Sequence, residues 1–212
     1  MQDIVNALWN EIFPSKCVFC KKSSPNFICS IHKKALKILP ESYAFDETMV
    51  YSVADYRNPI TKRLVFLYKF WGIFKISDFI AKQILEEFSE LIPKNSWLVP
   101  IPLHWTRFIW RGYNQAEKIA KSLQKIRPDL QICTQLKRLK KTKQQALLSK
   151  KERENNMTGV FGGKNIKIPK NSSIFLIDDV FTSGSTVRAA KKTLKEKKIQ
   201  KINIICFART RD

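Results

Sequence analysis

The chain has 212 residues, 44% of them hydrophobic, and contains only six glycines and nine prolines. These values suit one ordinary domain with a small appendage, and they exclude collagen-like, solenoid and disordered chains. With 39 Lys and Arg against 18 Asp and Glu, the formal net charge of +21 favours a polyanionic partner, with nucleic acid ahead of an anionic membrane face. A generally basic surface without such a partner is the alternative.

The location of the protein is predicted from two features of the sequence. No apolar run is long enough to span a bilayer, and the N-terminus carries Asp3 and Glu11 where a secretory signal would be basic and then apolar. We therefore expect a cytoplasmic protein, with peripheral attachment at the inner membrane face as a further option. Five cysteines, an odd number in a reducing compartment, favour a metal site or free thiols over disulfides.

The N-terminal part reads as an appendage. Residues 1–13 predict a short helix with Ile4, Leu8 and Ile12 on one side, interrupted by Pro14. Residues 15–34 then hold three of the five cysteines and one of the two histidines. We expect a metal-binding appendage over residues 1–45 and a larger domain over residues 46–212.

Two short ligand pairs lie in this appendage, Cys17-x-x-Cys20 and Cys29-x-x-His32. A gap of two residues lets paired ligands hold one tetrahedral ion, and two such pairs complete a closed Cys₃His shell. The closed shell predicts a structural zinc, which would fold a segment too short to build its own core. Three reduced thiols beside an incidental histidine are the alternative.

From Val50 onward, short apolar strands alternate with amphipathic helices. Strands are expected at 50–54, 97–101, 174–177 and 202–207, and helices from Asn58-Pro59, through 80–91, through 116–126 and through 187–194. A loop is expected from Pro102. This alternation predicts an α/β fold with a mostly parallel sheet flanked by helices. Ligands of such sheets bind at the carboxyl ends of the strands, so the loops after Ile101 and Ile177 are the expected site.

The strand that begins at Ile174 leads into a segment with the chemistry of a phosphate and ribose site. Two adjacent carboxylates, Asp178 and Asp179, can accept hydrogen bonds from vicinal sugar hydroxyls and help hold Mg²⁺ through water. Small hydroxyl residues and one glycine then open a helix, where free N–H groups and the positive dipole end favour a phosphate. These residues are Thr182, Ser183, Gly184, Ser185 and Thr186. A capped helix after an ordinary strand is the alternative.

This segment resembles the phosphoribosyl pyrophosphate (PRPP) motif of type I phosphoribosyltransferases. More closely, the chain is similar to the ComF family of bacterial natural competence. Three further blocks carry that resemblance: residues 98–104, residues 111–117, and a third block. The third block consists of Gln145, Leu148, Ser149, Glu152, Arg153, Asn156 and Phe161.

The resemblance implies a type I phosphoribosyltransferase-like fold and a role for each part of the site. Asp178 and Asp179 would contact the ribose hydroxyls, and Thr182 to Thr186 would hold the 5′-phosphate of PRPP, which binds together with Mg²⁺. The segment from Pro102 to Arg111 resembles the pyrophosphate-binding loop, where Arg107 and Arg111 are anion ligands by their charge. The family's four-cysteine ribbon has His32 as its fourth ligand here, and histidine binds zinc equally well.

Basic residues gather in two further segments. Residues 130–151 contain no acidic residue, and phosphate neutralisation by their lysines would give salt-sensitive DNA binding. The expected DNA-binding residues are Lys137, Arg138, Lys140, Lys141 and Lys143; a second cluster spans Lys191 to Lys198. In phosphoribosyltransferases a mobile basic loop stands in the place of 137–151, so the two uses compete for the same side chains.

Aromatic residues alternate with arginines at 107–113. Phe108, Trp110 and Tyr113 lie among Arg107 and Arg111, as expected for base stacking, and burial of these rings in the core is the alternative. His104, which follows the strand at 97–101, is a candidate acid or base or else a packed structural histidine.

Three functions remain open on this sequence. The first is a competence protein that binds single-stranded DNA on the cytoplasmic side and carries a site for PRPP or a related phosphoribosyl ligand. The second is an active phosphoribosyltransferase that passes the phosphoribosyl group from PRPP to a nucleobase or another nitrogen acceptor. The third is a zinc-containing module that recruits a competence helicase.

Overall fold

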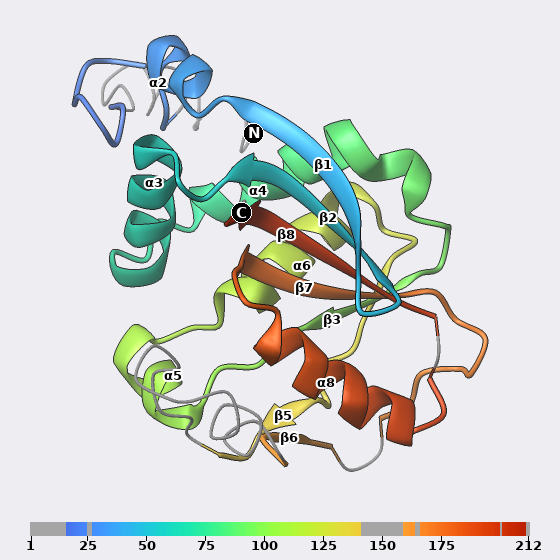
Figure 1. Ribbon diagram of the computed structural model, residues 1–212. Helices are drawn as coiled ribbons and strands as arrows, with labels where there is room; N and C mark the ends of the chain where they lie inside the picture. The colour runs from blue at the N-terminus through green and yellow to red at the C-terminus, as the bar shows by residue number, and fades with distance from the viewer. Residues whose placement is uncertain (1–15, 25–26, 141–158, 164–165, 200, 211–212) are drawn as a thin grey trace, which may run out of the picture.

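The computed structural model describes residues 16–24, 27–140, 159–163, 166–199 and 201–210. A six-stranded sheet forms the centre of the molecule, in the order β1-β2-β8-β7-β3-β4 (Figure 1). Its strands are β1 (Ile38–Phe45), β2 (Thr48–Asp55), β3 (Trp97–Pro100), β4 (Gln131–Ile132), β7 (Ile174–Phe181) and β8 (Ile202–Arg209). Only β1 runs antiparallel to its neighbour, as one arm of a hairpin with β2.

The helices and a small hairpin surround this sheet. The helices are α2 (Ser30–Ala35), α3 (Pro59–Phe70), α4 (Lys75–Phe88) with the short η1 (Ser89–Leu91), α5 (Trp105–Arg111), α6 (Gln115–Ile126) and α8 (Ser185–Glu196). A two-stranded sheet pairs β5 (Lys137–Arg138) with β6 (Phe161–Gly162). Among the described residues, none of the helices combines the length and the apolar character required to cross a bilayer.

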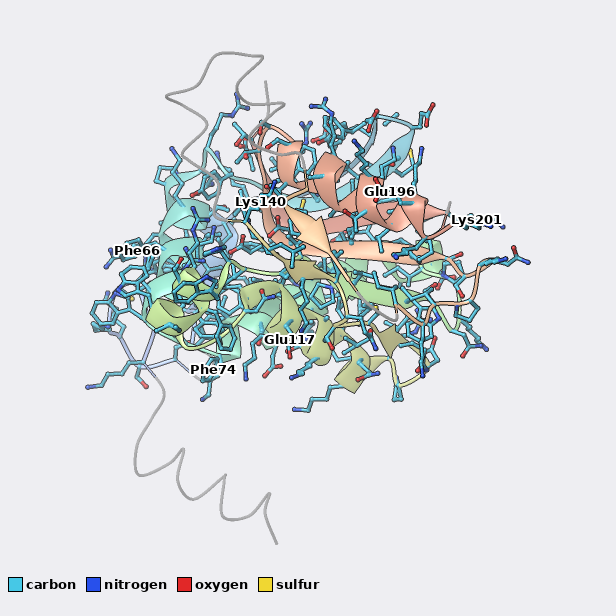
Figure 2. All side chains as sticks on the ribbon, turned by 90° about the horizontal axis from the view of Figure 1, so that it is seen from below. Phe66, Phe74, Glu117, Lys140, Glu196 and Lys201 are labelled. Atoms are coloured by element: carbon cyan, nitrogen blue, oxygen red, sulfur yellow. The ribbon has the colours of Figure 1, made fainter. Side chains whose placement is uncertain are left out.

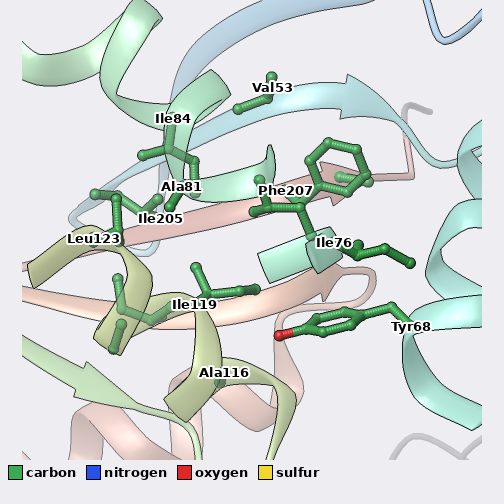
Figure 3. Packing of buried hydrophobic residues seen from close by; sticks show 14 of the residues in the cluster. Val53, Tyr68, Ile76, Ala81, Ile84, Ala116, Ile119, Leu123, Ile205 and Phe207 are labelled. Carbon is green, nitrogen blue, oxygen red and sulfur yellow. The ribbon is translucent and has the colours of Figure 1, made fainter. Parts of the chain in front are cut away.

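Two hydrophobic clusters cover the two faces of the sheet. One packs α3, α4 and α6 against inward residues such as Phe175, Ile205 and Phe207 (Figure 3). The other packs α8 against the opposite face through Val187, Ala190 and Leu194. Helices on both faces are the usual way to bury a parallel sheet, so the expected α/β fold is confirmed.

Several expected element boundaries are confirmed, with physical reasons visible in the structure. Helix α3 begins at Pro59, and the Asn58 side chain accepts hydrogen bonds from the N–H groups of Ile60 and Thr61. Asn114 caps α6 in the same way through Ala116 N–H. The start at Asn58 is as the sequence predicts, whereas the cap at Asn114 was not predicted.

Three elements differ from expectation. The segment after Pro102 is a loop only to His104, because His104 caps a seven-residue helix, α5, that ends at the left-handed Gly112. Strand β7 extends to Phe181, so both carboxylates lie within the strand and not after it. Strand β1 was not expected, and the boundary drawn between residues 45 and 46 falls in the β1–β2 turn. The helix predicted at 1–13 lies outside the described residues.

Candidate functional site

A small polar cavity opens where the carboxyl ends of β3 and β7 meet α5, α6 and β5. Its volume is about 140 Å³. It is lined by Lys69, Ile101, Pro102, Leu103, Arg107, Arg111, Asn114, Gln115, Ala116, Arg138, Asp178, Asp179, Val180 and Thr186. The cavity therefore joins the two loops that the sequence predicts as the site, and it brings residues 69, 107–116, 138 and 178–186 to one place.

The negative side of the cavity is the carboxylate pair on β7. Asp178 accepts a hydrogen bond from the backbone N–H of Asp179 at 2.8 Å, and Asp179 forms an ion pair with Lys69 at 3.2 Å. Burial, and then the charge of Asp179, raise the pKa of the Asp178 carboxyl to about 7. The pair therefore holds less than two full negative charges near neutral pH, and Lys69 stabilises the charge that remains.

The positive side of the cavity consists of three arginines from two elements. Arg107 and Arg111 come from α5 and Arg138 comes from β5. Burial lowers the pKa of the Arg111 and Arg138 guanidinium groups, although an arginine stays charged at neutral pH. Converging guanidinium groups bind phosphate oxygens with directed hydrogen bonds, so this side of the cavity is suited to a phosphorylated anion.

Two buried donors in this cavity lack partners. The amide Nε2 of Gln115 and the Nε of Arg111 have no hydrogen-bond partner among the described residues, although Arg111 donates to Gln115 Oε1 at 3.2 Å. A buried donor without a partner is costly, and such groups are normally satisfied by a bound molecule or water. The two donors are therefore free to bind acceptor atoms of a ligand or of water in the cavity.

The hydroxyl-rich segment Thr182 to Thr186 forms the turn between β7 and α8. Thr182 and Ser183 are exposed, Ser183 Oγ lies 3.1 Å from Ser185 Oγ, and Thr186 lines the cavity. Gly184 occupies the N-cap of α8 in the left-handed conformation, with φ of 70°. The segment thus begins α8 directly after the strand that carries the carboxylates, and its residue Thr186 lines the cavity with them.

Replacing Gly184 with Ala should disrupt this turn. A Cβ added at Gly184 would come within 2.1 Å of the Phe45 ring and 2.8 Å of the Phe181 ring, and the positive φ adds strain. We expect a loss of roughly 2–4 kcal/mol in the free energy of unfolding, measured by urea denaturation. Gly72 is the matched control, because its φ is also positive but nothing lies within 4 Å of an added Cβ. Equal losses in Gly184→Ala and Gly72→Ala would contradict the steric argument.

The expected DNA-binding residues are not all in one environment. Lys137 and Lys140 are exposed, whereas Arg138 lines the cavity and stacks over the Phe161 ring at 5.6 Å. Lys141, Lys143 and residues 145–156 of the third block lie outside the described residues. In the second basic cluster, Lys191 is buried and bound to the carbonyl and carboxylate of Asp46. The fold therefore uses at least one of the clustered lysines internally.

The aromatic residues at 108–113 separate into two groups. Phe108 and Trp110 are exposed, while Tyr113 is buried against Tyr68. His104 is buried, caps α5 through Thr106 N–H, and its Nδ1 lies 2.9 Å from the Thr106 hydroxyl. His104 therefore has a structural position, and the two exposed rings remain available for contacts with other molecules.

The four predicted metal ligands converge on one point. Their ligand atoms all lie within 4.8 Å of one another, with Cys29 Sγ 3.1 Å and Cys17 Sγ 3.6 Å from His32 Nδ1. Cys20 Sγ lies 4.0 Å from Cys29 Sγ, close to the separation of about 3.8 Å between two thiolates on a tetrahedral zinc. The cluster can therefore hold a metal ion.

Local groups prepare this cluster for a metal. Burial opposes ionisation of Cys17, but backbone N–H groups of Cys29, Cys20 and Phe19 outweigh it and lower the pKa of the thiol to about 6. The Phe19 ring stacks on His32 at 4.9 Å and fixes the imidazole plane. A thiolate at neutral pH and an oriented imidazole are what a metal ion requires.

The appendage is anchored to the main domain through α3 and α4. Ile28 and Leu36 are buried in the same cluster as these helices, and the Phe27 ring contacts the Phe79 ring at 5.7 Å. Asn58 also donates to the Ala35 carbonyl at 3.0 Å. The metal cluster therefore supports residues that belong to the core of the larger domain.

Sequence reasoning missed two residues of the cavity. Lys69 lies in the last turn of α3 and pairs with Asp179. The sequence does not predict this ion pair, because nothing distinguishes Lys69 from a solvent-exposed lysine on a helix. Gln115 falls inside the second family-like block at 111–117, yet nothing in its residue type showed that its amide would be buried. Only contacts between distant segments reveal both roles.

Known proteins resemble the chain at the level of domain and sequence. A family model described as a phosphoribosyl transferase domain matches residues 110–212. Competence protein ComFC of Bacillus subtilis is 34% identical over 144 residues, covering 66% of this chain and 55% of that protein. DNA utilization protein YhgH of Salmonella typhi is 28% identical over 166 residues, covering 75% of this chain and 71% of that protein.

The similarity to solved structures is more distant. A crystal structure of an adenine phosphoribosyltransferase has 16% identity, covers 85% of this chain and 90% of that chain, and gives a TM-score of 0.42, too low to support an argument. The chain spans about half the length of the curated competence proteins it matches.

The domain match and the site coincide. The matched residues include Arg111, Gln115, Arg138, both carboxylates and the turn to α8. The similarity to a competence protein extends over 144 residues, well beyond a single motif. Residues 110–212 are therefore similar to a phosphoribosyl transferase domain, and a longer part of the chain is similar to competence proteins, as the resemblance to the ComF family implies.

Proposed function

We propose that the protein acts in natural competence, binds PRPP or a related phosphoribosyl ligand with Mg²⁺ in the cavity, and binds single-stranded DNA on the cytoplasmic side of the membrane. One observation carries the ligand proposal: two carboxylates from β7 and three arginines from α5 and β5 line a single cavity. A phosphoribosyl pyrophosphate has hydroxyls for the first group and phosphates for the second.

Each group of cavity residues would bind the part of PRPP that matches its chemistry. Asp178 and Asp179 would accept hydrogen bonds from the ribose hydroxyls, and Thr186 with the α8 N-terminus would hold the 5′-phosphate. Arg107, Arg111 and Arg138 would bind the pyrophosphate. Mg²⁺, held through water by the carboxylates and directly by the ligand, would offset the negative charge of the phosphates.

The nucleic-acid part of the proposal rests on charge and on relatives. A formal net charge of +21 favours a polyanion, and the curated relatives bear the names competence protein and DNA utilization protein. Zinc in the Cys₃His cluster would be structural, because the four protein ligands leave no open position for chemistry. Recruitment of a competence helicase by this appendage belongs to the same proposal.

A second candidate function is catalysis by the same cavity. The arginines line the same cavity as the carboxylates, and they would bind the pyrophosphate of PRPP as it leaves when a nitrogen nucleophile attacks the ribose carbon. The residues would then act by positioning and by stabilising the leaving charge. An active enzyme would release pyrophosphate from PRPP in the presence of Mg²⁺ and a nucleobase or other nitrogen acceptor, and a binding protein would release none above the uncatalysed rate.

Calorimetric titration of PRPP and Mg²⁺ into the protein tests whether the ligand binds. The pH dependence of the affinity tests whether Asp178 contacts it. The raised pKa of Asp178, about 7, means that this carboxyl holds its proton at pH 6 and loses it by pH 8. The ribose hydroxyls need the ionised form as acceptor, so affinity should rise about tenfold between pH 6 and pH 8. Binding near pH 6 should also release protons, seen as heats that depend on the buffer. Saturable binding with equal affinity at both pH values would contradict this role for Asp178.

A further inference from the structure

One face of the molecule carries most of its exposed large hydrophobic side chains. Eight of the thirteen that the described residues expose lie in two short segments. They are Phe66, Phe70, Trp71, Phe74, Trp105, Phe108, Ile109 and Trp110, and we call them the aromatic surface. A soluble domain rarely exposes so many large apolar side chains together without a partner.

The aromatic surface is continuous between α3 and α5. The Phe70 ring contacts the Phe66 ring at 4.9 Å and the Trp110 ring at 5.3 Å, and so joins the two helices. Trp110, on α5, is 72% exposed. Figure 2 shows Phe66 and Phe74 at the same edge of the molecule, opposite Glu196 and Lys201. The rings therefore offer several faces and edges to solvent along one edge.

Positive charge predominates around these rings, although Glu117 lines a pocket together with Trp105 and Phe108. Residues 57–77 and 91–116 contain no acidic side chain, but they include Lys62, Arg63, Lys75 and Arg107. Cations also stand directly on the rings, with Arg63 at 5.6 Å from the Phe66 centroid and Arg111 at 5.2 Å from the Phe70 centroid. A partner of this surface must therefore combine flat apolar groups with negative charge.

We propose that the aromatic surface is the platform on which a single strand of nucleic acid stacks its bases, with its phosphates on the neighbouring lysines and arginines. The proposal rests on the proposed binding of single-stranded DNA, and it places that binding on α3 and α5 rather than on residues 137–143. Aromatic faces bind any base, and rings interleaved with cations are the usual surface for single strands.

The composition of the surface favours bases over other apolar partners. Seven of its eight large side chains are aromatic, and only Ile109 is aliphatic. Partner helices and acyl chains pack well on aliphatic side chains, whereas stacking requires ring faces. Cations placed over three of the rings, Phe66, Phe70 and Phe74, add attraction for phosphates close to the stacked bases.

The aromatic surface also adjoins the phosphoribosyl cavity. Arg111 stacks on Phe70 of the surface and lines the cavity, and Lys69, next to Phe70 in α3, is ion-paired with Asp179. Neither Phe66 nor Trp110 lines the cavity, so the two sites can be separated by mutation. Removing these two rings should leave the affinity for PRPP unchanged.

Equilibrium binding of a fluorescent 20-nucleotide single strand to the full chain tests the proposal, with the double variant Phe66→Ala, Trp110→Ala. Each stacked ring lost should weaken binding by about five- to a hundredfold, so we expect at least a tenfold loss for the pair. The slope of log affinity against log salt should stay the same, because no cation is removed. The matched control is Leu91→Ala, Ile126→Ala, which removes two exposed hydrophobics outside the surface and should bind as tightly as the unchanged chain.

The other possible outcomes distinguish a failure of the proposed DNA binding from a failure of its placement on the aromatic surface. If the unchanged chain binds no single strand, the proposed DNA function itself fails. If it binds and the double variant binds equally well, the placement on the aromatic surface is overturned while the function stands, and Lys137→Ala, Lys140→Ala becomes the variant to compare. If the double variant keeps its DNA affinity but no longer binds vesicles with anionic lipid, the surface is a membrane contact. If it keeps its DNA affinity but no longer forms a dimer in sedimentation, the surface contacts a second copy of the chain.

Discussion

Replacing Asp178 and Asp179 together with Asn should abolish saturable binding of PRPP with Mg²⁺. The substitution keeps the size of both side chains but removes the charges that accept from the ribose hydroxyls and support the metal. It also leaves Lys69 as a cation without its ion-pair partner on the floor of the cavity. We expect affinity to fall by at least a hundredfold in calorimetric titration, since hydrogen bonds to charged groups contribute roughly 1.5–3 kcal/mol each.

The control for this variant is Glu87→Gln, an exposed carboxylate of α4 outside the cavity, which should bind PRPP normally. The Asn variant should stay folded, because burial already disfavours the charged form of Asp178 and raises its pKa to about 7. Unfolding by urea checks that point. A folded variant that binds PRPP as tightly as the unchanged chain would show that the carboxylates are not part of the ligand site.

Replacing Cys29 with Ser should abolish the proposed binding of zinc and unfold the appendage. The Cys29 sulfur is the closest ligand atom to His32 Nδ1 at 3.1 Å, and its loss leaves three ligands where a structural site needs four. A structural zinc contributes on the order of 10 kcal/mol to the folding of an isolated finger. We therefore expect zinc content to fall from one equivalent to none, together with fast amide hydrogen exchange over residues 16–36.

The variant His32→Cys separates metal binding from the identity of the ligand. The resemblance to a four-cysteine ribbon implies that this variant keeps one equivalent of zinc and slow exchange. The main domain should lose part of its stability in Cys29→Ser, because Ile28 and Leu36 are buried against α3 and α4. Zinc retained at one equivalent by Cys29→Ser would contradict the Cys₃His assignment.

The sequence alone determined the parts of this protein whose chemistry is local. The segment from Ile174 to Thr186 shows a strand, two carboxylates and a helix start in thirteen consecutive residues, and the structure has the strand followed by the helix start, with both carboxylates inside the strand. The ligand pairs at 17–20 and 29–32 likewise carry their spacing in the sequence, and their atoms converge. The helix start at Asn58 follows from the hydrogen bonds of a single side chain to the first turn.

The tertiary structure alone decided which distant residues meet and which are exposed. Lys69 pairs with Asp179 across 110 residues of sequence, and Arg138 joins the cavity although its segment looked like a DNA-binding loop. Parallel strands bring their carboxyl ends together whatever sequence connects them, so no local sequence pattern predicts these contacts between distant residues. The exposure of a side chain also depends on distant segments. Tyr113 is buried and Trp110 is exposed although they are only three positions apart, and packing against α3 and α6 makes the difference.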